Sequence, residues 1–233
     1  MKLSNYIAGQ WVEGIGSIKN INPSDTSEII DEYTSCSNEQ FEQSIQSAAI
    51  AQKEWEAVGI EKKSQILIKI GDELVKKSKQ IGELLSREEG KPLNEGIGEV
   101  ARAGQQFQYY GSECLRLYGE KIPSTRPGFQ VEISREPIGI IGIISPWNFP
   151  IAIPAWKAAP ALMCGNAVIL KPASLTIGSA IALTEVIAKQ DIPDGLFNLV
   201  LGSGNDVGHK IATHPEIAAI TFTGSVEVGK KLY

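Results

Sequence analysis

Two polar residues stand where apolar segments of the sequence end. Asn148 lies in the turn "PWNFP", which follows the apolar run 138–145, and Lys171 closes the run 166–171. A side-chain amide is a neutral donor that can stabilise an oxyanion, and a lysine amine can bind ribose hydroxyls or phosphate. Two structural explanations stay open. Asn148 can satisfy its own turn backbone, and Lys171 can extend its charge into water from the sheet edge.

The segments that carry these residues have the pattern of a parallel sheet. Four short, nearly continuous apolar runs occur in the second half of the chain: "IGIIGIIS", "NAVILK", "LFNLVLG" and "IAAITFTG". Between them we expect helices at about 151–164, 176–190 and 204–213. Strands that are apolar on both faces and alternate with helices predict a parallel sheet covered on both sides. The expected fold class is therefore α/β, with a Rossmann-like sheet over 138–233.

Ligands of such sheets bind beyond the carboxyl ends of the strands. Four strand ends can lie along one edge, at 145–148, 171–174, 202–204 and 223–225. Gly224 lets the backbone approach a ligand, and a helix that starts near Ser225 offers free N–H groups to a phosphate. The segment "GSGNDVG" has the spacing G-x-G-x-x-x-G, which is a weak nucleotide-loop signal. The residues alone indicate a nucleotide-binding α/β domain, with an oxidoreductase as the favoured class.

The first 137 residues are expected to surround this sheet. Short strands with turns are expected in the first 35 residues, a helix that begins after Asn38 as its N-cap, and further helices at 61–88 and 93–117. The segment "GFQVEISREPIG" is typical of an extended ribbon, which is either a surface hairpin or an edge that pairs with another subunit. We divide the chain into strands and long helices at 1–120, the ribbon at 121–137 and the cofactor-binding core at 138–233.

Composition excludes several classes of function. The 233 residues carry a net charge of −5 without a Lys/Arg cluster, which argues against a nucleic-acid partner. An apolar run of about 18 residues is missing, as is a signal-peptide core, so neither a membrane span nor secretion is expected. Three widely spaced cysteines (Cys36, Cys114 and Cys164) suit a reducing cytoplasm rather than a disulfide framework. The Cys/His spacing predicts no metal site.

Three motifs together carry a family resemblance. "PWNFP", "GNAVILKPAS" and "TFTGSVEVG", in this order and at these spacings, resemble the NAD(P)-dependent aldehyde dehydrogenase superfamily. The likeness covers the chain from "YIAGQWVEG" onward. The stretch from "REEGKPLNEG" to "PAWKAAPAL" looks most like the α-ketoglutaric semialdehyde (2,5-dioxopentanoate) branch, with succinate-semialdehyde dehydrogenases as close neighbours. The resemblance implies oxidation of a small-molecule aldehyde to its acid, in an intact enzyme that is a dimer or tetramer built through the ribbon.

The resemblance also implies a role for each site residue. Asn148 would be the oxyanion donor and Lys171 the anchor of the adenosine ribose. The other cofactor-binding positions would be Ile144, Ser145, Pro146 and Trp147 as a backbone wall, Gly204 on the adenine side, and Gly224, Ser225 and Gly229 at the pyrophosphate. Ser174 departs from the family pattern, because members that prefer NAD usually carry a glutamate there. A glutamate would repel a 2′-phosphate, so Ser174 predicts a preference for NADP, with NAD also possible.

The family's nucleophilic cysteine and general-base glutamate lie in segments that follow the glycine-rich helix. This chain ends at Tyr233, before both, and none of its three cysteines lies in a suitable setting. We therefore expect the catalytic domain to be absent and the chain to be inactive alone. The alternative is a cofactor-binding or interaction module that has no catalytic activity.

Overall fold

The computed structural model describes residues 5–232, which fold around a six-stranded sheet. The strand order is β10 (Ile217–Phe222), β7 (Ile140–Ile144), β8 (Ala167–Lys171), β9 (Phe197–Leu199), β1 (Asn5–Ile7) and β2 (Gln10–Val12). The first four strands are parallel, whereas β1 pairs antiparallel with β9, and β2 antiparallel with β1. The expected parallel core is confirmed, and an N-terminal hairpin that the sequence did not place extends it.

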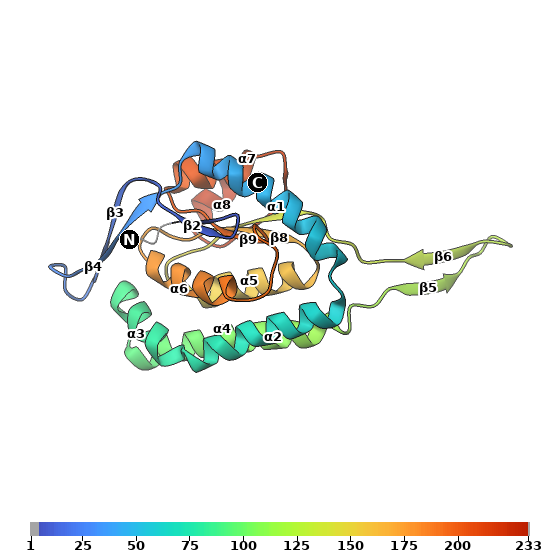
Figure 1. Ribbon diagram of the computed structural model, residues 1–233, viewed down its shortest axis with the longest axis horizontal. Coiled ribbons are helices and arrows are strands. Elements are labelled where there is room, and N and C mark those ends of the chain that lie inside the picture. Colours follow the sequence, from blue (N-terminus) through green and yellow to red (C-terminus); the bar gives the residue numbers. More distant parts are fainter. Residues whose placement is uncertain (1–4, 233) are drawn as a thin grey trace.

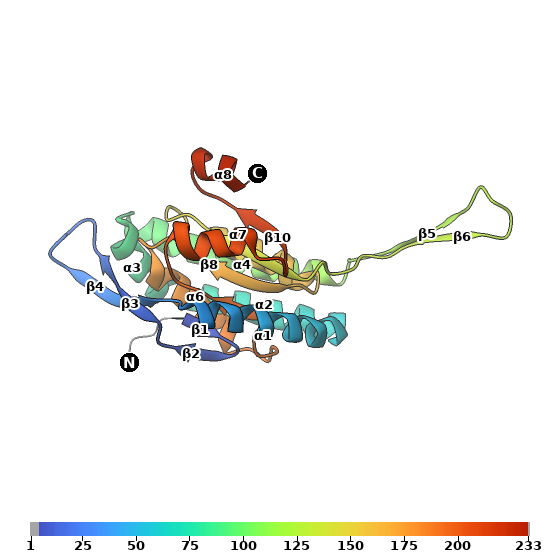
Figure 2. The same ribbon diagram turned by 90° about the horizontal axis from the view of Figure 1, so that it is seen from above.

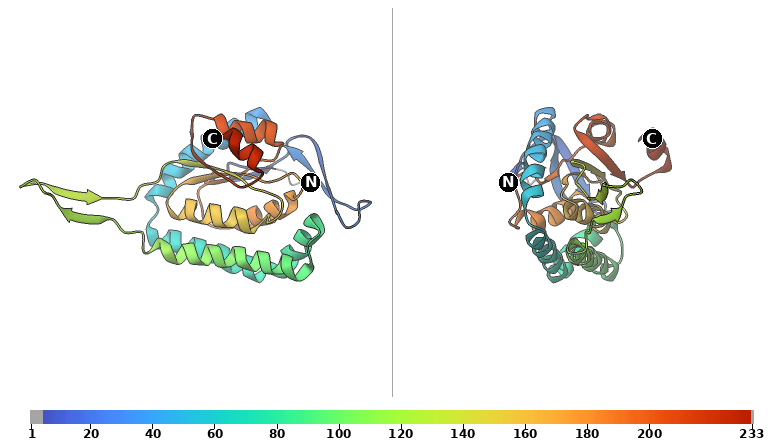
Figure 3. Two further views of the ribbon diagram at one scale, coloured as in Figure 1. Left: turned by 180° about the vertical axis from the view of Figure 1, so that it is seen from behind. Right: turned by 90° about the vertical axis from the view of Figure 1, so that its right-hand side faces the viewer.

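Helices cover both faces of the sheet, as predicted. One face carries α1 (Asn38–Ala57) and α7 (His209–Thr213), and the other carries α5 (Ala152–Met163) and α6 (Ile177–Ala188). Figures 1 and 3 show a further layer outside α5 and α6, formed by α2 (Ile60–Lys76) and α4 (Leu93–Cys114). Every residue of β7 and β8 is buried, because helices cover both sides of these two inner strands.

The outer helices pack closely through glycines. A Cβ atom at Gly71 of α2 would lie 2.5 Å from the carbonyl oxygen of Gly104 in α4, and one at Gly104 would lie 2.6 Å from the carbonyl of Gly71. Such distances leave no room for a side chain at either position. Glycine here therefore sets how closely α2 and α4 approach.

Two expectations about the N-terminal helices are wrong. The N-cap of α1 is Ser37 rather than Asn38, because Ser37 forms a reciprocal capping box with Gln40. The helix expected over 61–88 is two helices, α2 and α3 (Ser78–Glu89), which meet at Lys77 with φ −91° and ψ 4°. An uninterrupted apolar stripe does not reveal a change of direction that leaves the buried face intact.

Two hairpins extend beyond the layers. The ribbon of β5 (Glu120–Pro123) and β6 (Gln130–Ile133) is exposed along its length and projects from one end of the body. The pair β3 (Ile15–Ile21) and β4 (Ile29–Ser35) lies at the opposite end (Figures 1 and 2). Among the helices of residues 5–232, none combines the length and apolarity needed to cross a membrane.

Candidate functional site

The carboxyl ends of the four parallel strands lie along one edge of the sheet, as the sequence predicts. Ile144, at the end of β7, is in register with Lys171 of β8 and with Phe222 of β10. The N–H of Ser145 donates to the carbonyl of Lys171 at 3.2 Å, and that of Thr223 to the carbonyl of Ile144 at 3.1 Å. The turns after these strands therefore start level with one another.

Lys171 is buried at this edge without a carboxylate partner among residues 5–232. The residue is 5% exposed, and its Nζ donates to the carbonyl of Pro172 at 2.8 Å. Burial lowers the pKa of Lys171 to about 8. The amine does not extend into open water, so the explanation as an edge lysine in solvent is wrong. Two of its three potential donors have no protein acceptor within the described residues, which leaves them for a ligand.

Ser145 offers a second unsatisfied group. Its residue is 4% exposed, and its Oγ has no hydrogen-bond partner within the described part of the chain. Pro146 is partly buried and Trp147 is 52% exposed. Trp147 borders a cavity of about 260 Å³ together with Leu175, so the turns after β7 and β8 share one hollow. Most of the rest of its lining comes from β3, the turn after β3, Glu88 and Glu89, and Trp147 is the only one of the predicted cofactor residues, all within residues 5–232, that borders it.

Ser174 is exposed in the turn between β8 and α6. The start of α6 is already occupied by Glu88, which accepts hydrogen bonds from the N–H groups of Gly178 at 2.6 Å and Ser179 at 2.7 Å. Burial raises the pKa of Glu88, and these hydrogen bonds oppose that rise. Because a carboxylate already balances the positive end of this helix, a ligand phosphate near Ser174 must depend on side chains.

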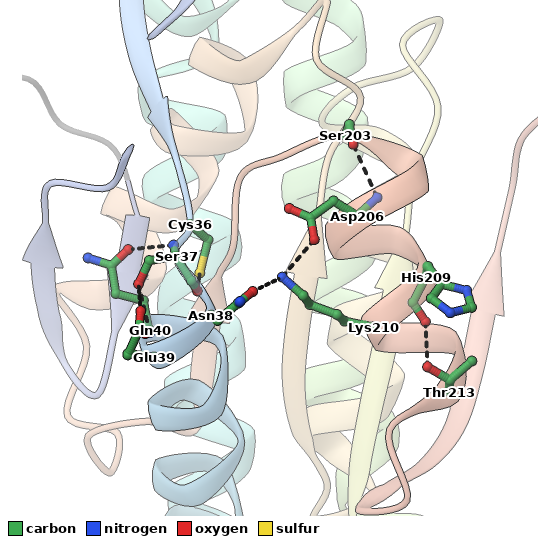
Figure 4. Close-up of polar contacts among 10 residues, drawn as sticks. All are labelled: Cys36, Ser37, Asn38, Glu39, Gln40, Ser203, Asp206, His209, Lys210 and Thr213. Carbon is green, nitrogen blue, oxygen red and sulfur yellow. Dashed lines mark hydrogen bonds and ion pairs between the residues drawn. The ribbon is translucent and has the colours of Figure 1, made fainter. Parts of the chain in front are cut away.

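The loop after β9 leads into a π-helical turn, η1 (Gly204–Gly208), which α7 continues. Ser203 caps the turn by accepting from the N–H of Asp206 at 3.1 Å, and Lys210 pairs with Asp206 at 2.6 Å. Figure 4 shows Lys210 also donating to Asn38 at the start of α1. Lys210 of α7 therefore ties this turn to the start of α1. Gly204 itself is exposed and remains accessible to a ligand.

The strand-glycine-helix junction after β10 lies at the outer edge of the sheet (Figure 2). Ser225 caps α8 (Val226–Leu232) by accepting from the N–H of Val228 at 3.3 Å. Gly224 is exposed, whereas a Cβ atom at Gly229 would lie 3.4 Å from the ring of Phe222. That distance is an ordinary van der Waals contact, so the role expected of Gly229 stays a prediction.

Asn148 lies in an exposed turn between β7 and α5, and its side chain makes no hydrogen bond within residues 5–232. The explanation that its amide satisfies the local backbone is therefore wrong. Within the same residues, no hydrogen bond joins Lys171 to Asn148, Ser174, Gly204 or Ser225. These residues share the sheet edge through neighbouring turns, and the stem of Lys171 also packs beside Gly208 of η1.

The three cysteines are poor nucleophiles. Burial raises the pKa of the Cys36 thiol to about 12. It also raises the pKa of Cys114 and of Cys164. A thiol that stays protonated at neutral pH attacks carbonyl carbon poorly.

The sequence reasoning missed several buried charged residues. Lys157 of α5 is 8% exposed, its Nζ donates to Oγ1 of Thr221 at 2.8 Å, and burial lowers its pKa to about 8. Glu88, Lys91 and Glu99 are also buried or nearly so. A charged residue inside an otherwise apolar helical segment, as in "IPAWKAAPAL", was the available signal for Lys157.

A parallel sheet whose strands end in polar and glycine turns, with a desolvated lysine at an inner strand, is the architecture typical of nucleotide-binding α/β proteins. The sequence matches the "Aldehyde dehydrogenase family" over residues 11–233, so the chain belongs to the aldehyde dehydrogenase family.

Known relatives match along the whole chain. The "2,5-dioxopentanoate dehydrogenase" of Saccharolobus solfataricus is 36% identical over 234 residues, which cover 100% of this chain and 49% of the relative. The "Alpha-ketoglutaric semialdehyde dehydrogenase" of Bacillus subtilis is 38% identical over 228 residues, covering 97% and 47%. The NADP-dependent glyceraldehyde-3-phosphate dehydrogenase of Bacillus halodurans, solved with NADP, superposes with a TM-score of 0.95 at 33% identity, covering 100% and 50%. The chain spans about half the length of these relatives.

Proposed function

We propose that this chain forms the dinucleotide-binding part of an enzyme that oxidises a semialdehyde to the carboxylic acid with NADP or NAD. The observation that carries the proposal is the buried amine of Lys171, which has no carboxylate partner and a single protein acceptor within residues 5–232. Lys171 lies next to Ser145 at the sheet edge, and the Ser145 hydroxyl has no hydrogen-bond partner within the same residues. The two remaining N–H groups of this amine and the Ser145 hydroxyl can donate to the ribose and phosphate oxygens of a dinucleotide. Members of the family use NAD or NADP.

Each residue of the edge has a defined task in this proposal. Lys171 holds the adenosine ribose, and the turn that begins with Ser145 and Pro146 forms a wall of the cofactor site. Gly204 leaves room beside the adenine, and Gly224 leaves room for the pyrophosphate next to Ser225. The dinucleotide supplies the hydride acceptor when it is bound.

Asn148 provides the oxyanion donor in this proposal. Its amide is exposed and has no protein acceptor or donor within residues 5–232, so it can meet the aldehyde oxygen. A neutral N–H₂ group stabilises the charge that develops on that oxygen without binding an anion in the resting state. Because burial keeps all three thiols of the chain protonated, we place the nucleophile outside this chain.

The names of the relatives favour 2,5-dioxopentanoate as substrate. Titration of the purified chain with NADP and NAD tests the cofactor part of the proposal, and failure of both to bind would refute it. A coupled assay of the full-length protein with 2,5-dioxopentanoate and succinate semialdehyde tests the substrate part.

In that protein we expect the ribbon β5–β6 to pair with another subunit in a homo-oligomer. The unpaired cysteines suit a cytoplasmic location.

Ser174→Glu should turn the cofactor preference toward NAD. In this proposal the new carboxylate lies beside the 2′-phosphate of NADP. Repulsion between the two negative charges should lower the NADP/NAD affinity ratio by at least about tenfold. Ser174→Gln is the matched control, because it has the same size without the charge. Dissociation constants of both cofactors measure the ratio, and an unchanged ratio in Ser174→Glu contradicts the assignment of Ser174.

The affinity for NADP should fall as pH rises through about 8, the pKa to which burial lowers Lys171. The 2′-phosphate of NADP sits on the ribose that Lys171 holds, and its negative charge stabilises the ammonium form of Lys171. NADP therefore binds most strongly where Lys171 is protonated, and its affinity falls by up to about tenfold per pH unit above that pKa. Titrations from about pH 6.5 to about pH 9.5 give the slope. In Lys171→Met the slope should disappear, and a slope that persists assigns the titration to another group.

A further inference from the structure

A buried ion pair lies behind the turn that carries Asn148. Lys91 follows α3, and Glu99 lies in the second turn of α4. Their side chains are 9% and 2% exposed, and Nζ of Lys91 lies 2.6 Å from Oε2 of Glu99. Glu89 approaches the same amine at 2.9 Å. Burial would lower the pKa of Lys91, but the hydrogen bonds and charges of Glu99 and Glu89 outweigh it and raise that pKa, so the amine is charged.

Glu99 fixes the end of the turn. Its Oε1 accepts from the N–H of Ile151 at 3.0 Å and from that of Ala152 at 3.1 Å. These two groups begin α5, where N–H donors have no partner inside the helix. Ile151, the N-cap residue of α5, has no side chain that could accept them. A glutamate from another helix therefore caps α5 and holds residues 151–152 in place.

Lys91 fixes the middle of the same turn. Its Nζ donates to the backbone carbonyl of Asn148 at 3.1 Å and lies 4.3 Å from the centroid of the Phe149 ring. One ammonium group thus contacts Glu99, the carbonyl of Asn148 and the face of the next side chain. Together, Lys91 and Glu99 tie the turn to α4 at two successive places.

The contacts of Lys91 and Glu99 determine the direction in which the Asn148 side chain points. The Asn148 side chain has no hydrogen-bond partner within residues 5–232, so neighbouring side chains do not orient it by hydrogen bonding. Its direction follows from the backbone that Lys91 and Glu99 hold. A donor must stay within about 0.5 Å and 10–20° of the productive geometry to stabilise an oxyanion fully.

The contacts of this pair reach beyond its own charges. A buried ion pair can often be replaced by apolar residues at little cost to stability, so burial alone does not explain this one. Both residues also contact backbone atoms of the turn, so they stabilise the start of α5 and at the same time fix the backbone that carries Asn148. We infer that Lys91 and Glu99 are positioning residues that orient Asn148 toward the aldehyde oxygen. This inference rests on the function proposed above for Asn148.

A double-mutant cycle in the full-length protein tests the inference. Lys91→Met keeps the length of the side chain and removes its charge and donors. It should lower kcat by about 10- to 100-fold while the dissociation constant of NADP changes by less than about threefold. In an Asn148→Ala background the same change should lower kcat by less than about twofold further, because the donor that Lys91 orients is already gone.

Glu99→Gln is the companion variant. Its amide oxygen can still accept from Ile151 and Ala152, while its N–H₂ group faces Lys91 instead of a carboxylate. It keeps the cap of α5 and should lose a smaller part of kcat than Lys91→Met. If Lys91→Met does not fold, Glu99→Gln carries the same cycle with Asn148→Ala.

Several outcomes would overturn the inference. Additive losses in the cycle would mean that Lys91 acts independently of Asn148, and an unchanged kcat in both variants would show that neither residue positions anything. If Asn148→Ala retains full activity, the proposed role of Asn148 fails by itself.

Hydrogen exchange tests separately whether Lys91 holds the turn in place. The amides of Ile151 and Ala152 should exchange at least about tenfold faster in Lys91→Met, with β8 unchanged. Equal rates in wild type and variant would refute any hold on the turn.

Discussion

Replacing Asn148 with alanine should lower the kcat of aldehyde oxidation by about 10²–10³-fold, which is the usual loss for one oxyanion donor. Cofactor affinity should change by less than about twofold, because the amide acts on the reacting oxygen and not on the dinucleotide. The fold should be unaffected, since the Asn148 side chain is exposed and makes no hydrogen bond within residues 5–232. Steady-state rates with a semialdehyde and NADP, together with calorimetric titration of NADP, separate the two effects.

Asn148→Asp is the matched control for this prediction. Aspartate has the shape of asparagine, but its ionised carboxylate only accepts hydrogen bonds and carries a negative charge. It should therefore lose at least as much activity as alanine, although it fills the same space. A kcat within about threefold of wild type in both variants would remove Asn148 from the mechanism. Normal activity in Asn148→Asp alone would show that size matters at this position and hydrogen-bond donation does not.

The sequence predicted the sheet edge because its signals are local. A strand that is buried on both faces must be apolar throughout, as β7 is, and the residue that ends such a strand is then conspicuous. Lys171 stands out for this reason, and its burial and position agree with the prediction. Parallel strands also place their carboxyl ends together, so the turns after β7, β8, β9 and β10 could be assigned to one edge from their order alone.

The sequence could not predict what holds those turns in place. Glu99 meets Ile151 across 52 positions and Glu88 meets Gly178 across 90, and the helical pattern of their own segments does not indicate either partner. The same applies to β1, which joins the sheet beside β9 although its three residues look like any short strand. Contacts between distant segments depend on how the layers stack, and local patterns do not encode that.

Glu88→Ala should lower the free energy of unfolding by about 3 kcal/mol or more. The carboxylate is almost fully buried and accepts from the N–H groups of Gly178 and Ser179, the hydroxyl of Ser179 at 2.6 Å, and the side-chain amide of Asn20. Each buried donor left without a partner costs about 1–3 kcal/mol, and hydrogen bonds to charged groups are at the strong end of the range. Urea unfolding at neutral pH measures the loss.

Glu83→Ala provides the reference for that loss, because Glu83 is an exposed residue of the same helix and undergoes the same truncation. It should change stability by less than about 0.5 kcal/mol. Glu88→Gln should fall between the two, since its amide keeps one acceptor oxygen but turns an N–H₂ group toward donors. Equal stabilities of Glu88→Ala and Glu83→Ala would mean that water replaces the carboxylate at the start of α6.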